Sequence, residues 1–511
     1  MKHEELFVDF KSLQDNEAWQ SVYTLYTSHI NIFSFIINRV HKRYGMDVTT
    51  ARDAVLYELI SSYYEPSHRK VLHERKPFKW FFVYLFFLIG VLCSGIINFF
   101  FTLFQKNEKI DILYDEMWSE NSWYNRFYKY IDAEIESDYS KALLYAHPGI
   151  TKDLFGIKVN GWSGKIINRR YKSFLFHPRL SCSIFLKEFS FIWPLLKLSK
   201  NINIFFFYLR LLKRLLIYSS QIENVNATVL IAAGDYYWNP LKYHAYKKSI
   251  SNIMLIQHNY KNEYLYNRLF QYCDHYFAHS QTAIDKLEGM PFSKKHAIGS
   301  FQLIPFLQPT NPSYDILFVS QQVYDNYQNT LPSLDQDKLI KQHNILMDNF
   351  KMYLLENPNM RCLYITKPSY LSREPALSLE EEFKDIKNLQ FLEAYGEKMF
   401  DLISKSKLII NMYSSIGFEA YGLNKKVLWI NYDHCCSAMK YDTEEEALHI
   451  LIADNSYDTF KKRVNLLLSE NSEVNEHYQS LKEKYMNIQK NPAKITADII
   501  EKLIHANPAK A

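Results

Sequence analysis

Short apolar runs alternate with longer helical stretches through most of the chain, a pattern that predicts parallel β-sheets covered by helices. The runs are apolar on both faces, as strands buried on both sides must be. Before residue 304 they are Ala142–Ala146, Val229–Ala233, Ile253–Ile256 and Tyr276–Ala278. After residue 313 they are Asp315–Ser320, Arg361–Thr366, Leu389–Leu392, Lys407–Asn411 and Lys426–Asn431. We therefore expect an α/β fold with two Rossmann-like domains in tandem.

Changes in this pattern set the expected domain boundaries. A segment with three prolines, Ile304–Ser313, separates the two sets of runs and predicts an interdomain linker. Ahead of the first set, apolar spacing in Trp19–Tyr26 and Ile30–Ile37 predicts helices. The expected division is an N-terminal helical region (1–77), an apolar segment (78–105), a first Rossmann-like domain (106–303), a second (304–490), and a C-terminal helix and tail (491–511).

The apolar segment is uncharged from Trp80 to Phe104, which is about the length needed to cross a bilayer. It lies too far from the N-terminus for a signal peptide. Basic residues crowd its N-terminal flank, which favours a cytoplasmic location for that side. Besides a span, Gly90, Ser94 and Gly95 would allow a re-entrant hairpin, and an interfacial helix or a buried core helix stays open as well.

A second stretch, Asn203–Tyr218, mixes apolar residues with Arg210, Lys213 and Arg214. This composition is typical of an interfacial helix that contacts anionic lipid. It is equally typical of an amphipathic helix that packs against its own domain.

Composition narrows the class of protein. Of the 511 residues, 48% are hydrophobic and 23% charged, which predicts a folded protein of two or three domains. The net charge of +5 comes without a polybasic run, so nucleic acid is not an expected partner. Six cysteines without a CxxC pair predict a reducing compartment and no structural zinc.

The segment Leu408–Asn431 carries the clearest chemical signal. It predicts a buried strand, a turn of small residues, a helix start and a second buried strand. Ser414, Ser415 and Gly417 fall where the strand gives way to the helix, so backbone N–H groups and the helix dipole would face an anion such as a phosphate. Glu419, about one turn further, is placed to accept hydrogen bonds from sugar hydroxyls.

A plainer interpretation of the same residues is helix capping. Ser at a helix start is commonly an N-cap, and Glu in the first turn commonly interacts favourably with the helix dipole. A capping box places the two residues three apart, whereas Ser415 and Glu419 are four apart. Capping therefore explains the pair less well than an anion site does.

Four motifs lie within residues 225–435, namely Ala233-Gly234-Asp235, Gln257-His258-Asn259, Ile298-Gly299-Ser300 and Ser414-Ser415-Ile416-Gly417-Phe418-Glu419-Ala420. In this order they resemble motifs of GT-B-fold glycosyltransferases of bacterial surface-polysaccharide assembly. This is the capsule, O-antigen and Kdo-transferase group, with the glycerophosphotransferases of teichoic acid synthesis as cousins. In that group Gln-His is followed by Gly, where this chain has Asn259. The group often carries Lys-Pro-His-Pro, where this chain has Lys367-Pro368-Ser369-Tyr370 and no histidine.

The resemblance implies transfer of a sugar from a CMP- or UDP-type nucleotide-sugar to a lipid-linked or growing polysaccharide acceptor. It implies that Lys367, Ser414, Ser415, Gly417 and Glu419 bind the donor. The catalytic base would be Asp235 or His258, between which the residues do not decide, with Glu263 a weaker candidate. Gly299 and Ser300 would lead into the second domain.

No metal and no cofactor are expected beyond the nucleotide-sugar co-substrate. Asp335-Gln336-Asp337 invites comparison with metal-binding DxD motifs, but it stands at a predicted helix start, where carboxylates answer the dipole. The expected location is the cytoplasmic face of the bacterial inner membrane, with the apolar segment in contact with it. A single span would conflict with this, because it would place the donor site on the far side of the membrane.

Three other functions stay open at this point. A nucleotide-sugar epimerase shares the fold and a related donor turn, but needs neither membrane nor lipid acceptor. A transferase of polyol phosphate from a CDP-glycerol-type donor would break a different bond. An inactive membrane scaffold of polysaccharide assembly would bind no donor.

Overall fold

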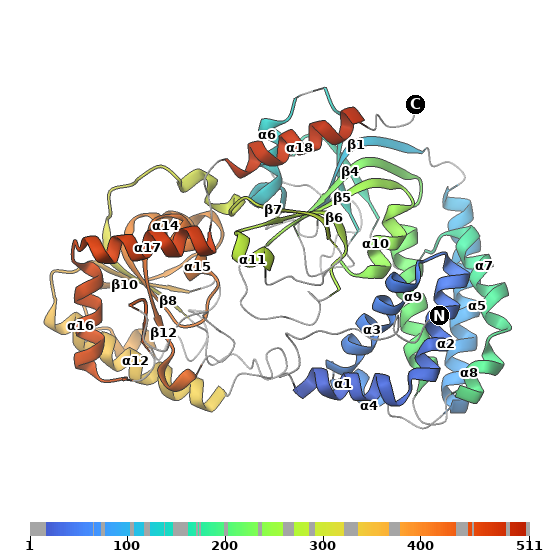
Figure 1. Ribbon diagram of the computed structural model, residues 1–511, viewed down its shortest axis with the longest axis horizontal. Helices are drawn as coiled ribbons and strands as arrows, with labels where there is room; N and C mark the ends of the chain where they lie inside the picture. Colours follow the sequence, from blue (N-terminus) through green and yellow to red (C-terminus); the bar gives the residue numbers. More distant parts are fainter. Residues whose placement is uncertain are drawn as a thin grey trace.

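The computed structural model describes residues 17–64, 66–72, 77–102, 107–116, 123–136, 138–146, 162–169, 172, 175–198, 203–233, 238–258, 270–285, 292–320, 336–366, 379–435, 448–451, 454–486 and 491–506. Within them the chain forms two all-parallel sheets flanked by helices and joined through residues 298–313 (Figure 1). The predicted α/β fold with two Rossmann-like domains is confirmed.

The first sheet has seven strands in the order β3-β2-β1-β4-β5-β6-β7. Every described pairing between them is parallel, and the central strands are buried on both faces. The strands are β1 (Glu108–Glu116), β2 (Lys141–Tyr145), β3 (Lys165–Asn168), β4 (Val225–Ala232), β5 (Ile250–Ile256), β6 (Cys273–Ala278) and β7 (Phe292–Ala297).

The second sheet repeats this topology with six strands in the order β10-β9-β8-β11-β12-β13. Its strands are β8 (Tyr314–Val319), β9 (Cys362–Thr366), β10 (Leu389–Glu393), β11 (Ser406–Asn411), β12 (Lys426–Ile430) and β13 (Ile450–Leu451). In each sheet the direction of growth reverses beside the first strand, between β1 and β4 and between β8 and β11. Ligands of such sheets bind beyond the carboxyl ends of the strands at this switch point.

Helices from the N-terminal half of the chain lie on one side of the first sheet (Figure 1). They are α1 (Glu17–Ser28), α2 (Ile30–Tyr44), α3 (Val48–Tyr64), α4 (Pro66–Leu72), α5 (Pro77–Thr102), α7 (Pro178–Phe189), α8 (Ile192–Leu198), α9 (Ile204–Gln221) and α10 (Pro240–Lys247). Helix α3 packs on α9 and α10, and Tyr272 Oη donates to Asp53 across 2.6 Å. By packing, residues 17–72 thus belong with the first sheet.

A helix from the far end of the chain covers the other face of the first sheet. Helix α18 (Pro492–Ala506) packs on β4 and on α6 (Lys129–Glu134), and it buries Ala497 and Ile500 in one cluster with Ile112 and Val229 (Figure 1). The chain therefore passes from the first domain to the second and back again.

The helices of the second domain surround β8 to β13. They are α12 (Gln336–Glu356), α14 (Glu397–Ser404), α15 (Ile416–Gly422), α16 (Tyr457–Leu468) and α17 (Ser472–Tyr485). Helix α16 begins with a capping serine, since Ser456 accepts a hydrogen bond from the N–H of Thr459. Shorter elements complete the fold, namely the helix α11 (Gln281–Asp285), the π-helix η3 (Tyr124–Tyr128) and the 3₁₀ helices η7 (Phe301–Phe306) and η8 (Tyr432–His434).

Helix α5 contains the uncharged segment and is continuous over 26 residues. The break needed for a re-entrant hairpin is absent, so that alternative is wrong. Gly95 instead allows close packing, because a Cβ there would lie 2.5 Å from the Cβ of Ser181 in α7. Helix α5 is the one described helix that is long and apolar enough to span a membrane, and only 22% of its most apolar window is buried.

Helix α9 contains the second apolar stretch, and the structure decides between its two interpretations. Its apolar residues are buried, and Arg210 and Arg214 both form ion pairs with the buried Glu58 of α3. The helix packs against its own domain, so its interpretation as an interfacial helix is wrong.

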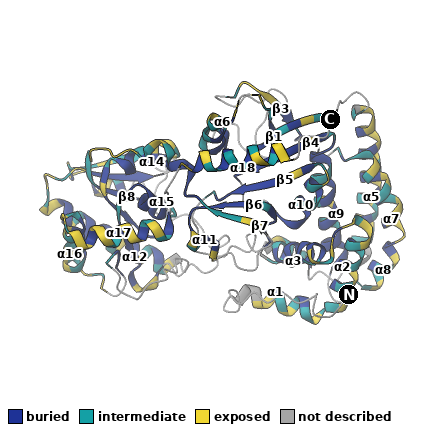
Figure 2. Ribbon diagram, turned by 45° about the horizontal axis from the view of Figure 1, so that its top comes forward, coloured by how far each residue is buried: buried dark blue, intermediate teal, exposed yellow. Residues whose placement is uncertain are grey.

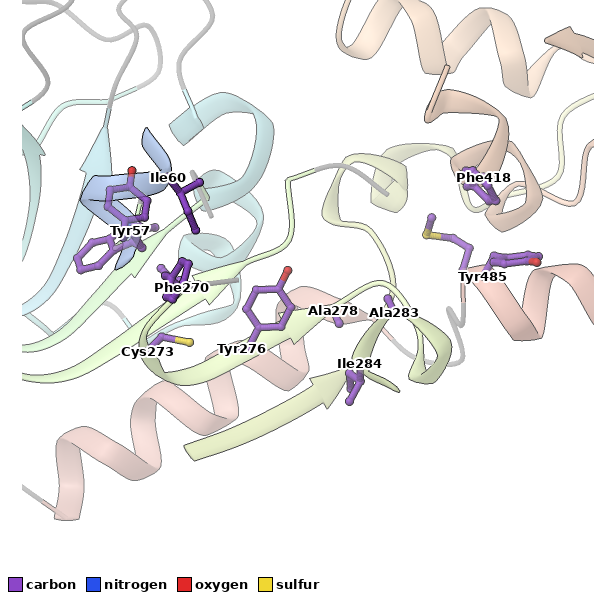
Figure 3. Close-up of a cluster of buried hydrophobic side chains, with 14 of the residues drawn as sticks. Tyr57, Ile60, Phe270, Cys273, Tyr276, Ala278, Ala283, Ile284, Phe418 and Tyr485 are labelled. Carbon is purple, nitrogen blue, oxygen red and sulfur yellow. The ribbon is translucent and has the colours of Figure 1, made fainter. Parts of the chain in front are cut away.

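The two domains meet partly through apolar contacts. Figure 3 follows one buried cluster from Tyr57 of α3, past Tyr276 of β6 and Ile284 of α11, to Phe418 and Tyr485 of the second domain. Helices α11 and α17 are in contact at this point. A polar network lies at the same junction and is described next.

Candidate functional site at the domain junction

The turn after β11 has the predicted form of strand, small-residue turn and helix. The Asn411 side chain fixes the turn, because its Nδ2 donates to the carbonyl of Ser414 (2.7 Å) and its Oδ1 accepts from the N–H of Ser414 (3.1 Å). Helix α15 then begins at Ile416. The side chains of Ser414 and Ser415 are half-buried at the carboxyl edge of the sheet, beside the switch point of β8 and β11.

Ser415 stands at the N-cap of α15 without acting as a capping side chain. It makes no side-chain hydrogen bond to the helix, and its backbone is itself helical. The N–H groups of Ser415 and Ile416 bond to no residue that the structure describes. Capping therefore does not account for Ser415, and these two N–H groups remain to bind an anion.

Gly417 has a packing role that the sequence did not reveal. A Cβ at this position would lie 2.5 Å from Asn411 Nδ2 and 2.5 Å from the ring of Trp429. Trp429 is held in turn by Tyr421, whose hydroxyl accepts from Trp429 Nε1 (2.7 Å). Gly417 thus lets α15 lie directly on β12 and Trp429.

Glu419 is the central residue of the junction. Its side chain is 2% exposed, and its Oε1 accepts from Ser300 Oγ (3.5 Å) and from Gln302 Nε2 (3.3 Å), both of the first domain. Burial raises the pKa of Glu419 to about 8, although nearby Arg126 and the Ser300 hydrogen bond oppose the shift. Oε2 makes no hydrogen bond to any described residue.

Groups from three strand ends of the first sheet gather around this carboxyl. Gln302 follows β7 and donates a second hydrogen bond to the carbonyl of His258, which follows β5 (3.3 Å). Arg126 of η3, after β1, donates to Gln302 Oε1 (2.6 Å) and to Tyr395 Oη of the second domain (3.2 Å). The carboxyl edges of the two sheets therefore face each other across Glu419.

Gly299 and Ser300 follow β7 and lead into this junction. Gly299 has a φ of +88°, a left-handed conformation that costs a residue with a side chain about 1–2 kcal/mol. The turn aims the Ser300 hydroxyl at Glu419.

The His258 side chain lies half-buried against two aromatic rings of the first domain. Its ring centroid is 5.5 Å from that of Phe127 and 6.1 Å from that of Trp123. These rings fix one wall of the junction, opposite α15.

Several predicted residues lie outside the described residues, namely Asp235, Asn259, Glu263, Asp335 and Lys367 with Pro368 to Tyr370. The strands that lead to two of them are in place, because β4 ends at Ala232 and β9 ends at Thr366. Asp337 lies exposed in the first turn of α12, where a carboxylate interacts favourably with the helix dipole.

The first sheet has its own carboxylates at the equivalent switch point, which the sequence analysis missed. Asp115 of β1 is 3% exposed and pairs with Lys242 of α10 (2.7 Å). The neighbouring Glu116 accepts from the N–H groups of Trp123 and Tyr124. The apolar-run pattern did not predict β1, because Asp and Glu alternate with the apolar residues of this strand.

A strained backbone marks the end of β12 along the same edge of the second sheet. Asp433 and His434 have φ values of 52° and 53°, in the left-handed region. Lys338 and Gln342 of α12 hold Asp433 through its carbonyl and carboxylate oxygens. Two consecutive non-glycine residues in this conformation were not predictable from residue type.

Solved structures similar to this chain include two kinds of enzyme. The wall teichoic acid polymerase TagF matches with a TM-score of 0.48 and 14% identity, over 84% of this chain and 98% of that one. The UDP-GlcNAc 2-epimerase of Neisseria meningitidis bound to UDP-GlcNAc matches with a TM-score of 0.42 and 15% identity, over 78% of this chain and 100% of that one. The Methanocaldococcus jannaschii UDP-GlcNAc 2-epimerase in complex with UDP-GlcNAc and UDP matches with a TM-score of 0.41 and 10% identity, over 77% of this chain and 99% of that one.

No protein-family model matches the chain, and no curated protein matches it in sequence. With TM-scores below 0.5, the structural likenesses carry no argument about activity. Function has to be argued from the residues of the junction.

Proposed function

We propose that the chain is a GT-B-type, metal-independent glycosyltransferase. It would move a sugar from a CMP- or UDP-type nucleotide-sugar to a lipid-linked or growing surface-polysaccharide acceptor, at the cytoplasmic face of the bacterial inner membrane. The observation that carries the proposal is Glu419, a buried carboxyl with one oxygen held by the opposite domain and the other without a partner among the described residues.

The second domain supplies the groups that suit a nucleotide-sugar. The N–H groups of Ser415 and Ile416, with the hydroxyls of Ser414 and Ser415, would bind the donor phosphate at the switch point. Lys367, which follows β9, would add positive charge. Glu419 Oε2 would bind a ribose or sugar hydroxyl one helical turn away.

The first domain would activate the acceptor. An acceptor hydroxyl attacks the anomeric carbon of the donor, the bond from that carbon to the phosphate oxygen breaks, and the nucleotide leaves with the electron pair. The hydroxyl proton passes to His258 or Asp235, and backbone N–H groups stabilise the charge on the departing phosphate. Arg126 adds a cation that contacts both domains.

The test is donor binding followed by product analysis. Thermal-shift screening with CMP-, CDP-, UDP- and GDP-sugars should find one class that raises Tm, and Glu419→Ala and Ser415→Ala should remove the shift. Glu356→Ala is the matched control, because Glu356 is a surface carboxylate of α12. An unchanged shift in both site variants would contradict the proposed donor site.

Product analysis then separates the reaction from its rivals. Transfer requires acceptor, so donor incubated alone should stay intact. Conversion of donor alone to an epimer would contradict transfer and favour an epimerase. Release of CMP from a CDP-polyol would favour polyol-phosphate transfer, and absence of any donor binding would favour a scaffold.

A further inference from the structure

The outer side of α5, α7 and α8 exposes large apolar side chains at the edge of the molecule furthest from the second domain (Figure 1). Helix α5 contributes Phe86 (69% exposed) and Phe100 (63%). Helices α7 and α8 contribute Leu186 (72%), Phe189 (54%) and Trp193 (72%). Figure 2 shows that exposed residues recur along α5 and α7. We call this surface the apolar face. Large exposed apolar side chains gathered on neighbouring helices mark a binding surface.

The charges around the apolar face indicate its partner. The described exposed charged side chains on α5, α7 and α8 are all cations, namely Lys79, Arg179, Lys187 and Lys197. The carboxylate of these helices, Glu188, is buried and paired with Arg39. Apolar and aromatic residues combined with Lys and Arg alone fit an anionic lipid surface. Two copies of this chain would instead bring like charges together across a symmetric interface.

The inner side of α5 shows how the helix would lie. Asn98 is fully buried, donates to the Phe176 carbonyl (2.8 Å) and to Glu223, and accepts from Lys172 (2.8 Å). Lys172 and Glu223 form a buried ion pair. Helix α7 packs along α5, so a crossing of the bilayer by α5 would also carry α7 and its ion pair of Glu188 with Arg39 into hydrocarbon, which is expensive.

We infer that the chain binds an anionic bilayer surface through the apolar face, with α5 lying in the plane of the membrane instead of crossing it. The phenyl rings and Trp193 enter the boundary between headgroups and acyl chains, and the four cations contact lipid phosphates. This orientation keeps both domains on one side of the membrane. The inference does not rest on glycosyl transfer, because lipid binding is measured without donor.

The first test is flotation of the full chain with vesicles of phosphatidylglycerol and phosphatidylethanolamine. The variant Phe86→Ser/Phe189→Ser/Trp193→Ser should lose about tenfold or more in affinity, because three exposed apolar groups no longer enter lipid. Its control, Met352→Ser/Leu355→Ser, removes exposed apolar residues from α12 and should bind as the parent does. Equal binding by the parent and the triple variant would overturn the inference.

Charge is tested by Arg179→Gln/Lys187→Gln/Lys197→Gln. This variant should lose the preference for phosphatidylglycerol over phosphatidylcholine, whereas Lys341→Gln/Lys387→Gln/Lys462→Gln in the second domain should keep it. If the parent forms a dimer without lipid and the triple apolar variant is monomeric, a second copy covers the face and the inference fails.

Orientation is tested with cysteines at the two ends of α5. In a Cys93→Ser/Cys182→Ser/Cys436→Ser background, Lys79→Cys and Thr102→Cys should both react with an impermeant maleimide in inverted inner-membrane vesicles, and neither should react in intact spheroplasts. Labelling of the two ends from opposite sides would show a span and overturn the proposed orientation.

Discussion

The two sheets share one topology, yet their switch points use buried carboxyls in opposite ways. In the first sheet Asp115 is paired with Lys242 at 2.7 Å, inside its own domain. In the second sheet Glu419 forms no such ion pair among the described residues, and burial raises its pKa to about 8. Topology therefore brings a carboxyl to each switch point, at the end of β1 in the first sheet and in the first turn of α15 in the second. The presence or absence of a close cation decides whether that carboxyl is structural or available for chemistry.

The largest effect expected from this comparison follows from Lys242→Met. The substitution leaves Asp115 buried without its cation, so unfolding free energy should fall by about 3–5 kcal/mol. Denaturant titration measures the change. The double variant Asp115→Leu/Lys242→Met should recover most of the loss. The control Lys494→Ala breaks an exposed pair with Asp498 and should change stability by less than about 1 kcal/mol.

Glu419→Gln should affect activity and not stability, in contrast to Lys242→Met. We expect transfer activity to be lost while the free energy of unfolding is retained or raised. We expect kcat/KM to fall about 100-fold or more if this carboxyl binds the donor. A loss of several kcal/mol in stability without a loss of donor binding would make Glu419 a structural residue like Asp115, and the comparison would fail.

The pH dependence of this variant sharpens the comparison. The folded pKa of Glu419, about 8, lies above its usual value of 4.5, so the protonated group contributes stability that is lost as pH rises through about 8. Glu419→Gln removes this contribution. The parent should weaken relative to the variant between pH 4.5 and about 8, by at most about 1.4 kcal/mol per pH unit. Parallel stability curves would show that the carboxyl titrates normally.

Gly417→Ala tests the packing of α15 against β12. The added Cβ would meet Trp429 and Asn411 at 2.5 Å, so stability should fall by about 1–3 kcal/mol. Gly90→Ala is the matched control, since its Cβ would meet nothing within 4 Å on a helix. That control should be neutral or stabilise by up to about 1 kcal/mol. Equal effects of the two substitutions would remove the packing argument.

The smallest expected change in stability is that of Ser415→Ala. Because Ser415 caps nothing with its side chain, we expect a change within about 0.5 kcal/mol, together with weaker nucleotide binding. Ser456→Ala removes a capping side chain and should cost about 1 kcal/mol. If Ser415→Ala costs as much as Ser456→Ala, Ser415 is a cap after all.

The fold was predictable where burial on both faces produced continuous apolar runs. Strands β4 to β6 and β8 to β12 follow such runs. Strand β1 was missed although it is central in its sheet, because Asp111, Asp115 and Glu116 interrupt its apolar residues. Asp115 can be buried there only because Lys242 meets it from 127 residues away, and no local pattern contains that contact.

The part of the candidate site that lies in one local segment was predictable from the sequence. Ser414, Ser415 and Glu419 belong to one local strand-turn-helix unit, whose form can be read from neighbouring residues. Arg126 and Gln302 join them only through the fold, since 117 residues separate Gln302 from Glu419. The burial of the two apolar helices likewise depends on contacts that are distant in sequence. Helix α9 is buried and forms ion pairs with Glu58 of α3, whereas α5 leaves one apolar side exposed.

Helix α18 sets an order of events during biosynthesis. It is made after both sheets, yet Ala497 and Ile500 complete the core against Ile112 and Val229 of the first sheet. While the ribosome is still translating the second domain, that cluster lacks the residues of α18. The first domain therefore has to wait for the second before it can close, and a nascent chain halted in between would present an apolar surface to chaperones.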